Sequence, residues 1–216
     1  MNPLALLGLG FLLGLRHATD PDHVVAVAAI TSRTRKLLPA AALGLVWGLG
    51  HTLTLFLVGG AILWLGVVVP ARVGLSMEFA VALALIVVGL FNLKHPHATP
   101  AHEERVTPAW RAFGVGLVHG LAGSAAVALL VLATVKDARG GALFLLLFGA
   151  GTLAGMTIVT TSFAAPLSLA AARWPGFGKS ARLVTGLASV GFGLWLVWQI
   201  GWVDGLFGGA PAWTPR

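Results

Sequence analysis

The chain has 216 residues, of which 57% are hydrophobic and 10% charged, and its mean hydropathy is +0.91. In a water-soluble domain roughly a quarter of the residues are charged. This composition therefore excludes a water-soluble domain and predicts an integral membrane protein. The length accommodates about six spanning helices of roughly 20 apolar residues each and leaves no room for a soluble catalytic domain. The chain contains no cysteine, which excludes disulfides and thiolate metal cages.

Six apolar runs, separated by charged or proline-rich segments, predict the spanning helices. They cover residues 3–30, 37–69, 74–93, 109–135, 141–172 and 181–203. The first run has no basic segment ahead of it and leads directly into a polar cluster, so we interpret it as a span of the mature protein and not as a signal peptide. The sequence therefore predicts an all-α protein with six transmembrane helices.

The formal net charge of +7 is explained by membrane topology, because the 14 lysines and arginines are scattered between apolar runs and form no nucleic-acid-binding face. The first, third and fifth connections carry nine of them: Arg33, Arg35, Lys36, Lys94, Arg105, Arg111, Arg173, Lys179 and Arg182. The opposite side carries four: Arg72, Lys136, Arg139 and Arg216. Since cations in short loops stay on the cytoplasmic side, we predict a multi-pass plasma-membrane protein with both termini outside.

The two halves of the chain resemble each other. At an offset of 102, residues 14–17 (Gly-Leu-Arg-His) fall on residues 116–119 (Gly-Leu-Val-His), and at an offset of 101, residues 48–51 fall on residues 149–152. Two successive groups of three spans must be inverted relative to each other, as in many secondary transporters. We therefore predict a 3+3 inverted repeat: residues 1–93 form the first repeat, 94–108 a histidine-rich cytoplasmic loop, and 109–216 the second repeat.

Ionisable residues interrupt the first apolar run at Arg16, His17, Asp20, Asp22 and His23. Each arginine or aspartate near the centre of a span costs roughly 2.5 to 3.5 kcal/mol on insertion scales, so a cluster of this kind indicates function. On a helix, His17, Asp20 and His23 share one broad face. Two imidazoles and two carboxylates are a nitrogen and oxygen donor set suited to a divalent first-row metal.

Pro21 stands inside this cluster and is expected to break the first helix. The missing proline N–H is expected to free the carbonyl of His17 and to let Asp22 turn toward the same centre. His51 and His119, each near the middle of another span, are predicted to complete the metal site, and His119 occupies the repeat position of His17.

Two other interpretations of the cluster stay open at this stage. One is a structural ion-pair network in which Arg16 neutralises an aspartate, and the other is a proton relay without metal. The central loop, with His95, His97 and His102, is either a solvated connector or a cytoplasmic metal buffer.

Residues 16–23, Arg-His-Ala-Thr-Asp-Pro-Asp-His, resemble the H-x4-D-H signature of the nickel/cobalt transporter family. Residues 48–52 are similar to its G-H-S/T segment, and residues 155–157 to its G-M-S/T element. The six-span length and residues 116–124 resemble the shorter UreH-like branch. The resemblance covers essentially the whole chain.

The resemblance implies a permease for Ni(II), with Co(II) as a further candidate ion, in which His17, Asp22 and His23 are the essential motif residues and Asp20 lies alongside. Ni²⁺ or Co²⁺ is then the transported substrate and no resident cofactor is expected. A cytoplasmic nickel chaperone or metalloenzyme maturation system is the expected partner. Pro21 replaces the usual alanine, and the acidic F-D-T-A-T-E element has no counterpart, so metal selectivity and the choice between uptake and efflux stay open.

Three other functions share parts of this pattern. His17 and Asp22 also satisfy the H-x4-D signature of glycerolipid acyltransferases, but that class needs a soluble or interfacial domain. Membrane di-iron desaturases need more embedded histidines than this chain has. An exporter of small organic or amino acids from the lysine-exporter superfamily shares the six-helix plan and is the alternative function.

Overall fold

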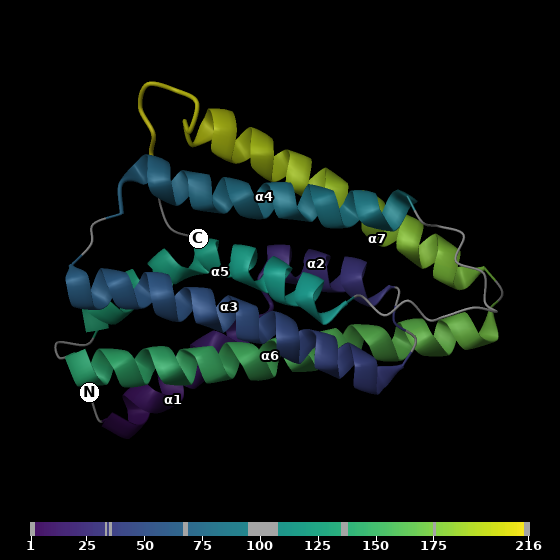
Figure 1. The fold of residues 1–216 in the computed structure, drawn as a ribbon, viewed down its shortest axis with the longest axis horizontal. Helices are drawn as coiled ribbons and strands as arrows, with labels where there is room; N and C mark the ends of the chain where they lie inside the picture. The colour runs from purple at the N-terminus through teal and green to yellow at the C-terminus, as the bar shows by residue number, and fades with distance from the viewer. Residues whose placement is uncertain are drawn as a thin grey trace.

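The computed structural model describes residues 3–32, 34, 36–66, 69–94, 108–134, 138–174 and 176–213, and describes side chains from residue 8 onward except for 123–138. Its helices are α1 (Pro3–His17), α2 (Pro21–Thr31), α3 (Leu37–Leu65), α4 (Ala71–Lys94), α5 (Ala109–Thr134), α6 (Ala138–Arg173) and α7 (Phe177–Trp198), and α7 continues into the π-helical segment η1 (Gln199–Val203) (Figure 1). The described residues contain no strand. The predicted all-α fold class is confirmed.

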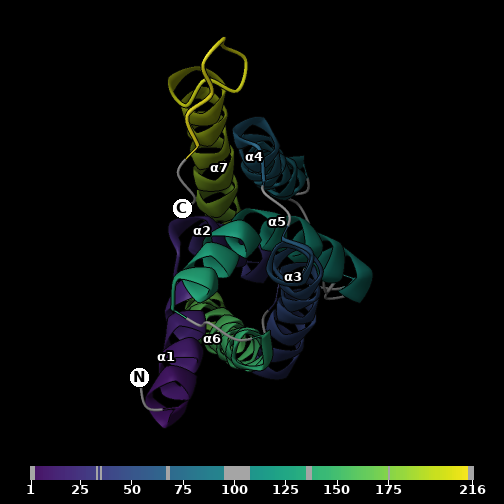
Figure 2. The same cartoon turned by 90° about the vertical axis from the view of Figure 1, so that its left-hand side faces the viewer.

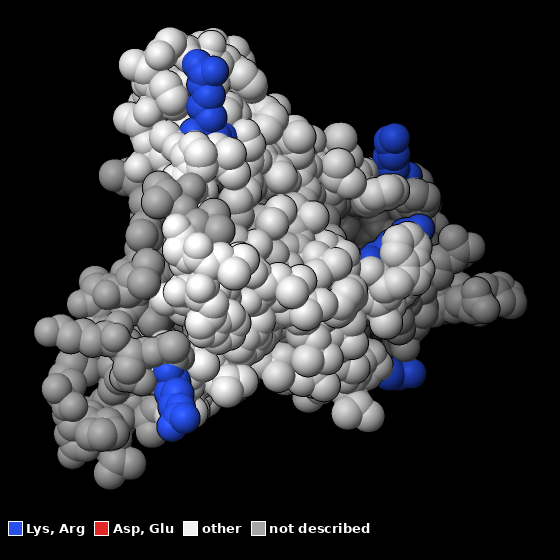
Figure 3. All heavy atoms as spheres, turned by 60° about the vertical axis from the view of Figure 1, so that its left-hand side comes forward, with Lys and Arg blue, Asp and Glu red and all other residues white. Residues whose placement is uncertain are grey.

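Four helical stretches in the described residues are long and apolar enough to cross a membrane: Leu37–Leu65, Ala71–Lys94, Arg139–Arg173 and Phe177–Val203. Their outer surfaces carry large apolar side chains. The face drawn in Figure 3 is mostly uncharged and shows only a few isolated lysine and arginine side chains, in blue. The protein is therefore a multi-pass helical membrane protein. The count of six spans and the inverted repeat stay predictions.

The first predicted span is broken where the sequence places Pro21. Asp20 is extended, with φ −61° and ψ 146°, as a residue before proline prefers, and Pro21 opens α2, where its missing N–H is no loss. The expectation of a free His17 carbonyl is wrong, because the Asp20 amide donates a 3.1 Å hydrogen bond to it. The tight turn thus replaces the bond that proline cannot make.

The second predicted helix ends four residues earlier than expected. The apolar run continues to Val69, but Gly66 adopts the left-handed conformation (φ 63°) directly after α3 and ends the helix at Leu65. Glycine adopts this conformation without steric cost, which makes it the usual residue at such a position.

The helices form two groups. α3 packs along α5 and α6, and α1 packs along α6, while α4 and α7 pair with each other on one side of the molecule (Figure 2). The short helix α2 contacts α4, α6 and α7 and so connects the groups. The helix break between α1 and α2 therefore lies where the two groups meet.

Glycines bring these helices into backbone contact. A Cβ added at Gly14 of α1 would overlap the carbonyl oxygen of Phe148 in α6, and a Cβ at Gly116 of α5 would overlap the carbonyl oxygen of Trp47 in α3. Small residues at helix crossings are what allow close packing in a membrane, where burial of apolar surface gives little driving force.

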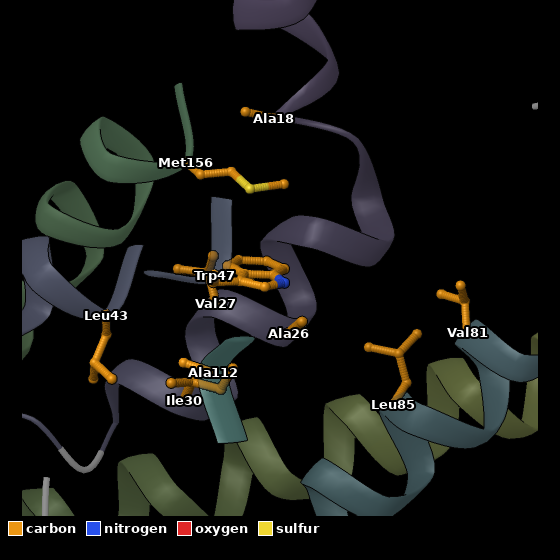
Figure 4. Packing of buried hydrophobic residues seen from close by; sticks show 10 residues of the cluster. All are labelled: Ala18, Ala26, Val27, Ile30, Leu43, Trp47, Val81, Leu85, Ala112 and Met156. Carbon is orange, nitrogen blue, oxygen red and sulfur yellow. The ribbon is translucent and has the colours of Figure 1, made fainter. Parts of the chain in front are cut away.

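An apolar cluster fills the space along α2 beyond the break. Val27 and Ile30 of α2 pack with Leu43, Trp47 and other buried side chains of α3, α4, α5 and α6 (Figure 4). This cluster closes the helix bundle between the break and the C-terminal end of α2.

The contact between α3 and α5 yields a stability prediction. Gly116→Ala should lower the melting temperature of the detergent-solubilised protein, because the new methyl group overlaps the Trp47 carbonyl and overpacking costs about 1–3 kcal/mol. Gly114→Ala on the same helix is the matched control, since a Cβ there meets nothing within 4 Å. Fluorescence-detected thermal unfolding measures both, and equal melting temperatures would show that the close contact is not required.

Candidate metal centre

Four histidines from four helices converge at the helix break. His17 ends α1, His23 lies in the first turn of α2, and His51 and His119 come from α3 and α5. The ring centroid of His17 lies 4.8 Å from that of His23 and 5.2 Å from that of His51, and His23 lies 5.0 Å from His51 and 5.7 Å from His119. His23, His51 and His119 are buried.

Close helix packing is what brings His51 and His119 into the cluster. A Cβ at Gly50 would overlap the carbonyl of Phe113, and a Cβ at Gly120 would lie 2.5 Å from the carbonyl oxygen of His51. Each histidine is thus flanked by a glycine that lets α3 and α5 touch. The break at Pro21 brings the other two histidines together from separate helices.

The two aspartates lie behind the imidazoles. Asp20 Oδ2 is 2.7 Å from Nδ1 of His17, and Asp22 Oδ1 is 3.0 Å from Nδ1 of His23. An ionised carboxylate only accepts hydrogen bonds, so Nδ1 of each ring carries the proton. A neutral imidazole held in this way presents the lone pair of Nε2 on its other side.

His119 is held in the same tautomer by a backbone group. Its Nδ1 donates to the Val115 carbonyl over 3.0 Å, so Nε2 of the neutral ring carries a lone pair. This Nε2 is buried and has no hydrogen-bond partner among the described residues. The ring of His119 also meets Trp47 edge to face at 5.6 Å, which fixes its orientation further.

His51 lies between two of these lone pairs. Its Nε2 is 3.3 Å from Nε2 of His17, and its Nδ1 is 3.5 Å from Nε2 of His23. A neutral imidazole has one N–H, so His51 can donate to only one of these neighbours and turns a lone pair toward the other. A cation placed among the rings removes this repulsion, because every lone pair then becomes a ligand.

The three rings have the spacing of a metal site. One ligand nitrogen from each of His17, His23 and His51 lies within 4.8 Å of the others. Nitrogen ligands at about 2.0–2.1 Å from a metal lie roughly 3–4 Å apart, so small ring movements suffice for binding. Asp20 and Asp22 fit the orienting carboxylates that commonly support metal-bound histidines. A direct ligand role for the aspartates and for His119 stays a prediction.

Arg16 does not form the ion-pair network considered from the sequence. The ion pairs of the described residues at this site join His17 to Asp20 and His23 to Asp22, and Arg16 is exposed without a partner there. Histidines therefore take the place beside the carboxylates that the ion-pair interpretation gave to Arg16.

Some features escaped sequence reasoning. The hydrogen bond from His119 to the Val115 carbonyl could have been predicted, because Val115 lies one helical turn before His119. Glu78 of α4 is a buried carboxylate inside an apolar run, and it accepts a 2.9 Å hydrogen bond from the indole of Trp213. The loop histidines His95, His97 and His102 lie outside the described residues.

Fold and site together define a class: a multi-pass helical membrane protein with a buried histidine cluster fit for a divalent metal ion. A family model described as high-affinity nickel-transport protein (NicO) matches residues 4–95. The urease accessory protein UreH of Bacillus sp. (strain TB-90) is 36% identical over 94% of this chain and 95% of its own length. The chain therefore belongs to the nickel/cobalt transporter family, in its UreH-like branch, and is a nickel transporter and not an enzyme.

Two plant relatives are more distant. The chloroplast proteins FOR GROWTH AND FERTILITY 1 and 2 of Arabidopsis thaliana are 25% and 26% identical, each over 87% of this chain. The chain covers 57% and 55% of their respective lengths. No solved structure matches the chain.

The carboxylate behind His23 yields a binding prediction. Asp22→Val should weaken Ni²⁺ binding roughly 10- to 100-fold, because loss of an orienting hydrogen bond to a ligand histidine typically costs that much. Asp22→Asn keeps an oxygen that accepts from Nδ1 of His23 but removes the negative charge, so it should lose less affinity than Asp22→Val. Calorimetric titration of the purified variants with Ni²⁺ measures both. An asparagine variant as weak as the valine variant would instead indicate that the charge of Asp22 binds the ion.

Proposed function

We propose that this protein is a permease for Ni(II), which also accepts Co(II), and that it binds the ion at the H-x4-D-H motif and moves it by alternating access. One observation carries the proposal. The lone pairs of His17 and His23 face the same ring, His51, and both His23 and His51 are buried.

The donor set favours this ion class. Imidazole suits nickel, cobalt, copper and zinc, whereas magnesium and calcium prefer oxygen ligands. The chain has no cysteine to favour soft metals. The carboxylates of Asp20 and Asp22 balance the charge of a divalent ion, so the loaded site is formally neutral in a low-dielectric region.

The glycine contacts support the inverted repeat of residues 1–93 and 109–216, joined by residues 94–108. Two backbone contacts join a helix of one half to a helix of the other half. Each of them has a counterpart between the residues that the sequence offsets of 101 and 102 place at the corresponding positions. The matching contacts are Gly14 with Phe148 and Gly116 with Trp47, and likewise Gly151 with Phe11 and Gly50 with Phe113. The pairing of α1 with α6 thereby corresponds to that of α5 with α3, as expected for six spans in two related groups.

The distribution of polar and apolar groups supports a direction of opening. The side chain of Asp20 is 40% exposed and that of Asp22 is 22% exposed, whereas the space beyond His23 is filled by Val27, Trp47 and their apolar neighbours. The start of α1 and the end of η1 lie at the same end of the helices (Figure 1), which fits both termini outside. The state described here is then closed toward the cytoplasm, and release requires the two repeats to rock apart at the apolar cluster.

The direction of net transport and the cytoplasmic partner complete the proposal. We take uptake as the physiological direction and a nickel chaperone or metalloenzyme maturation system as the recipient, since the relative in Bacillus is named a urease accessory protein. Efflux would use the same site. Export of organic or amino acids gives no reason for a buried histidine cluster.

Uptake of radioactive Ni²⁺ and Co²⁺ into proteoliposomes tests the proposal. His17→Ala, His23→Ala and His51→Ala should each reduce uptake at low metal concentration roughly 10- to 100-fold, because each removes a ligand nitrogen. Replacing His95, His97 and His102 together by alanine is the control, since it removes three imidazoles that the proposed site does not include and should leave most uptake intact.

Equal metal accumulation by the wild type and the three cluster variants would overturn the proposed function. Reversing the gradient in vesicles of known protein orientation separates uptake from efflux. If amino acids compete with the metal and the cluster variants retain full transport, the result would favour the amino-acid exporter.

A further inference from the structure

Helix α1 has one packed face and one open face. Gly10 and Gly14 lie against Phe144 and Phe148 of α6, the one helix with which α1 makes an extended contact in the described residues. Leu12 and Arg16 each stand two residues from Gly14, about 200° around the helix, and so on its opposite face. Leu12 is 61% exposed, and Figure 2 shows α1 at the edge of the helix assembly.

A charged side chain lies on this open face, one residue before α1 ends at His17. Arg16 is exposed and makes no ion pair with the part of the chain that the structure describes. It stands about 20 Å along the helix from Pro3, which is too deep for an arginine to reach the headgroups without bending the bilayer. Charged residues at this depth normally face protein or water and not lipid.

An opposite charge lies one turn away. The side chain of Asp20 is 40% exposed beside the helix break, and its Oδ2 binds His17. A patch with a cation and an anion four residues apart is complementary to a second copy of itself. Under a two-fold axis along the membrane normal, each arginine faces the aspartate of the other chain, so both charges are neutralised at once.

We propose that α1 forms the interface of a homodimer in which Arg16 pairs with Asp20 of the partner subunit. Asp20 lies three residues beyond the end of α1, and the long arginine side chain spans this short offset between the two chains. Leu9 and Leu12 supply apolar contact above the pair, and Gly8, where a Cβ would meet nothing within 4 Å, leaves room for close approach.

The second copy fits better than a lipid. A lipid phosphate would pair with Arg16 but would repel Asp20, whereas the two-fold arrangement satisfies both. The partner's Arg16 then also binds the carboxylate that orients His17. The inference depends on α1 lying in the membrane and not on which ion is carried.

Cysteine cross-linking in membranes tests the interface, because the chain has no cysteine of its own. Leu12→Cys should give a disulfide-linked dimer on mild oxidation. Leu57→Cys on α3 is the matched control, since Leu57 is 65% exposed and lies eight residues from the end of its helix. We expect several-fold more dimer from the Leu12 variant, and a roughly tenfold smaller yield when Arg16→Gln is added, as expected for loss of interhelical polar contacts in a membrane.

A count of subunits in the unmodified protein provides a second measurement. Native mass spectrometry of the wild type in nanodiscs should show two chains per particle, and Arg16→Gln should shift the population toward one. A monomeric wild type, or cross-linking at Leu12 no greater than at Leu57, would overturn the proposal. Dimers that persist undiminished in Arg16→Gln would also overturn it, because the interface would then lie elsewhere.

Discussion

The contact of one imidazole with two others governs this structure. His51 faces the lone pairs of His17 and His23, and a single neutral ring cannot satisfy both. The surrounding fold keeps this unfavourable arrangement in place. The aspartates fix the outer nitrogens, glycines hold α3 against α5, and the turn before Pro21 joins the two short helices. Each of these features is understandable as support for a binding site that is stable when a cation occupies it.

The helix break serves the site in a way that a continuous helix would not. In an unbroken α-helix, His17 and His23 would lie about 9 Å apart along the axis and point about 120° away from each other. The turn at residues 18–20 shortens that separation and still satisfies the backbone, because the Asp20 amide bonds the His17 carbonyl.

Much of the architecture was predictable, because each helix is an apolar run with a definite end. The break followed from Pro21, and the proximity of His119 to the first cluster was predicted from the sequence match of residues 14–17 with residues 116–119. What the sequence did not reveal was the side of each ring on which its aspartate lies. That choice depends on the local geometry of the turn. No periodicity encodes it. The end of α3 was missed because hydropathy continues past Gly66, whereas the backbone conformation does not.

The bond between Trp213 and Glu78 has a consequence for biogenesis. The carboxylate belongs to α4, while the indole that donates to it comes 135 residues later. A chain made from its amino end must therefore place the acid in the bilayer before its donor has been synthesised. The ring packs over Gly74 and against Ile62, so the contact between the final segment and the early helices can close only after synthesis has passed residue 213. This part of the protein therefore reaches its native packing only after α5, α6 and α7 have been synthesised.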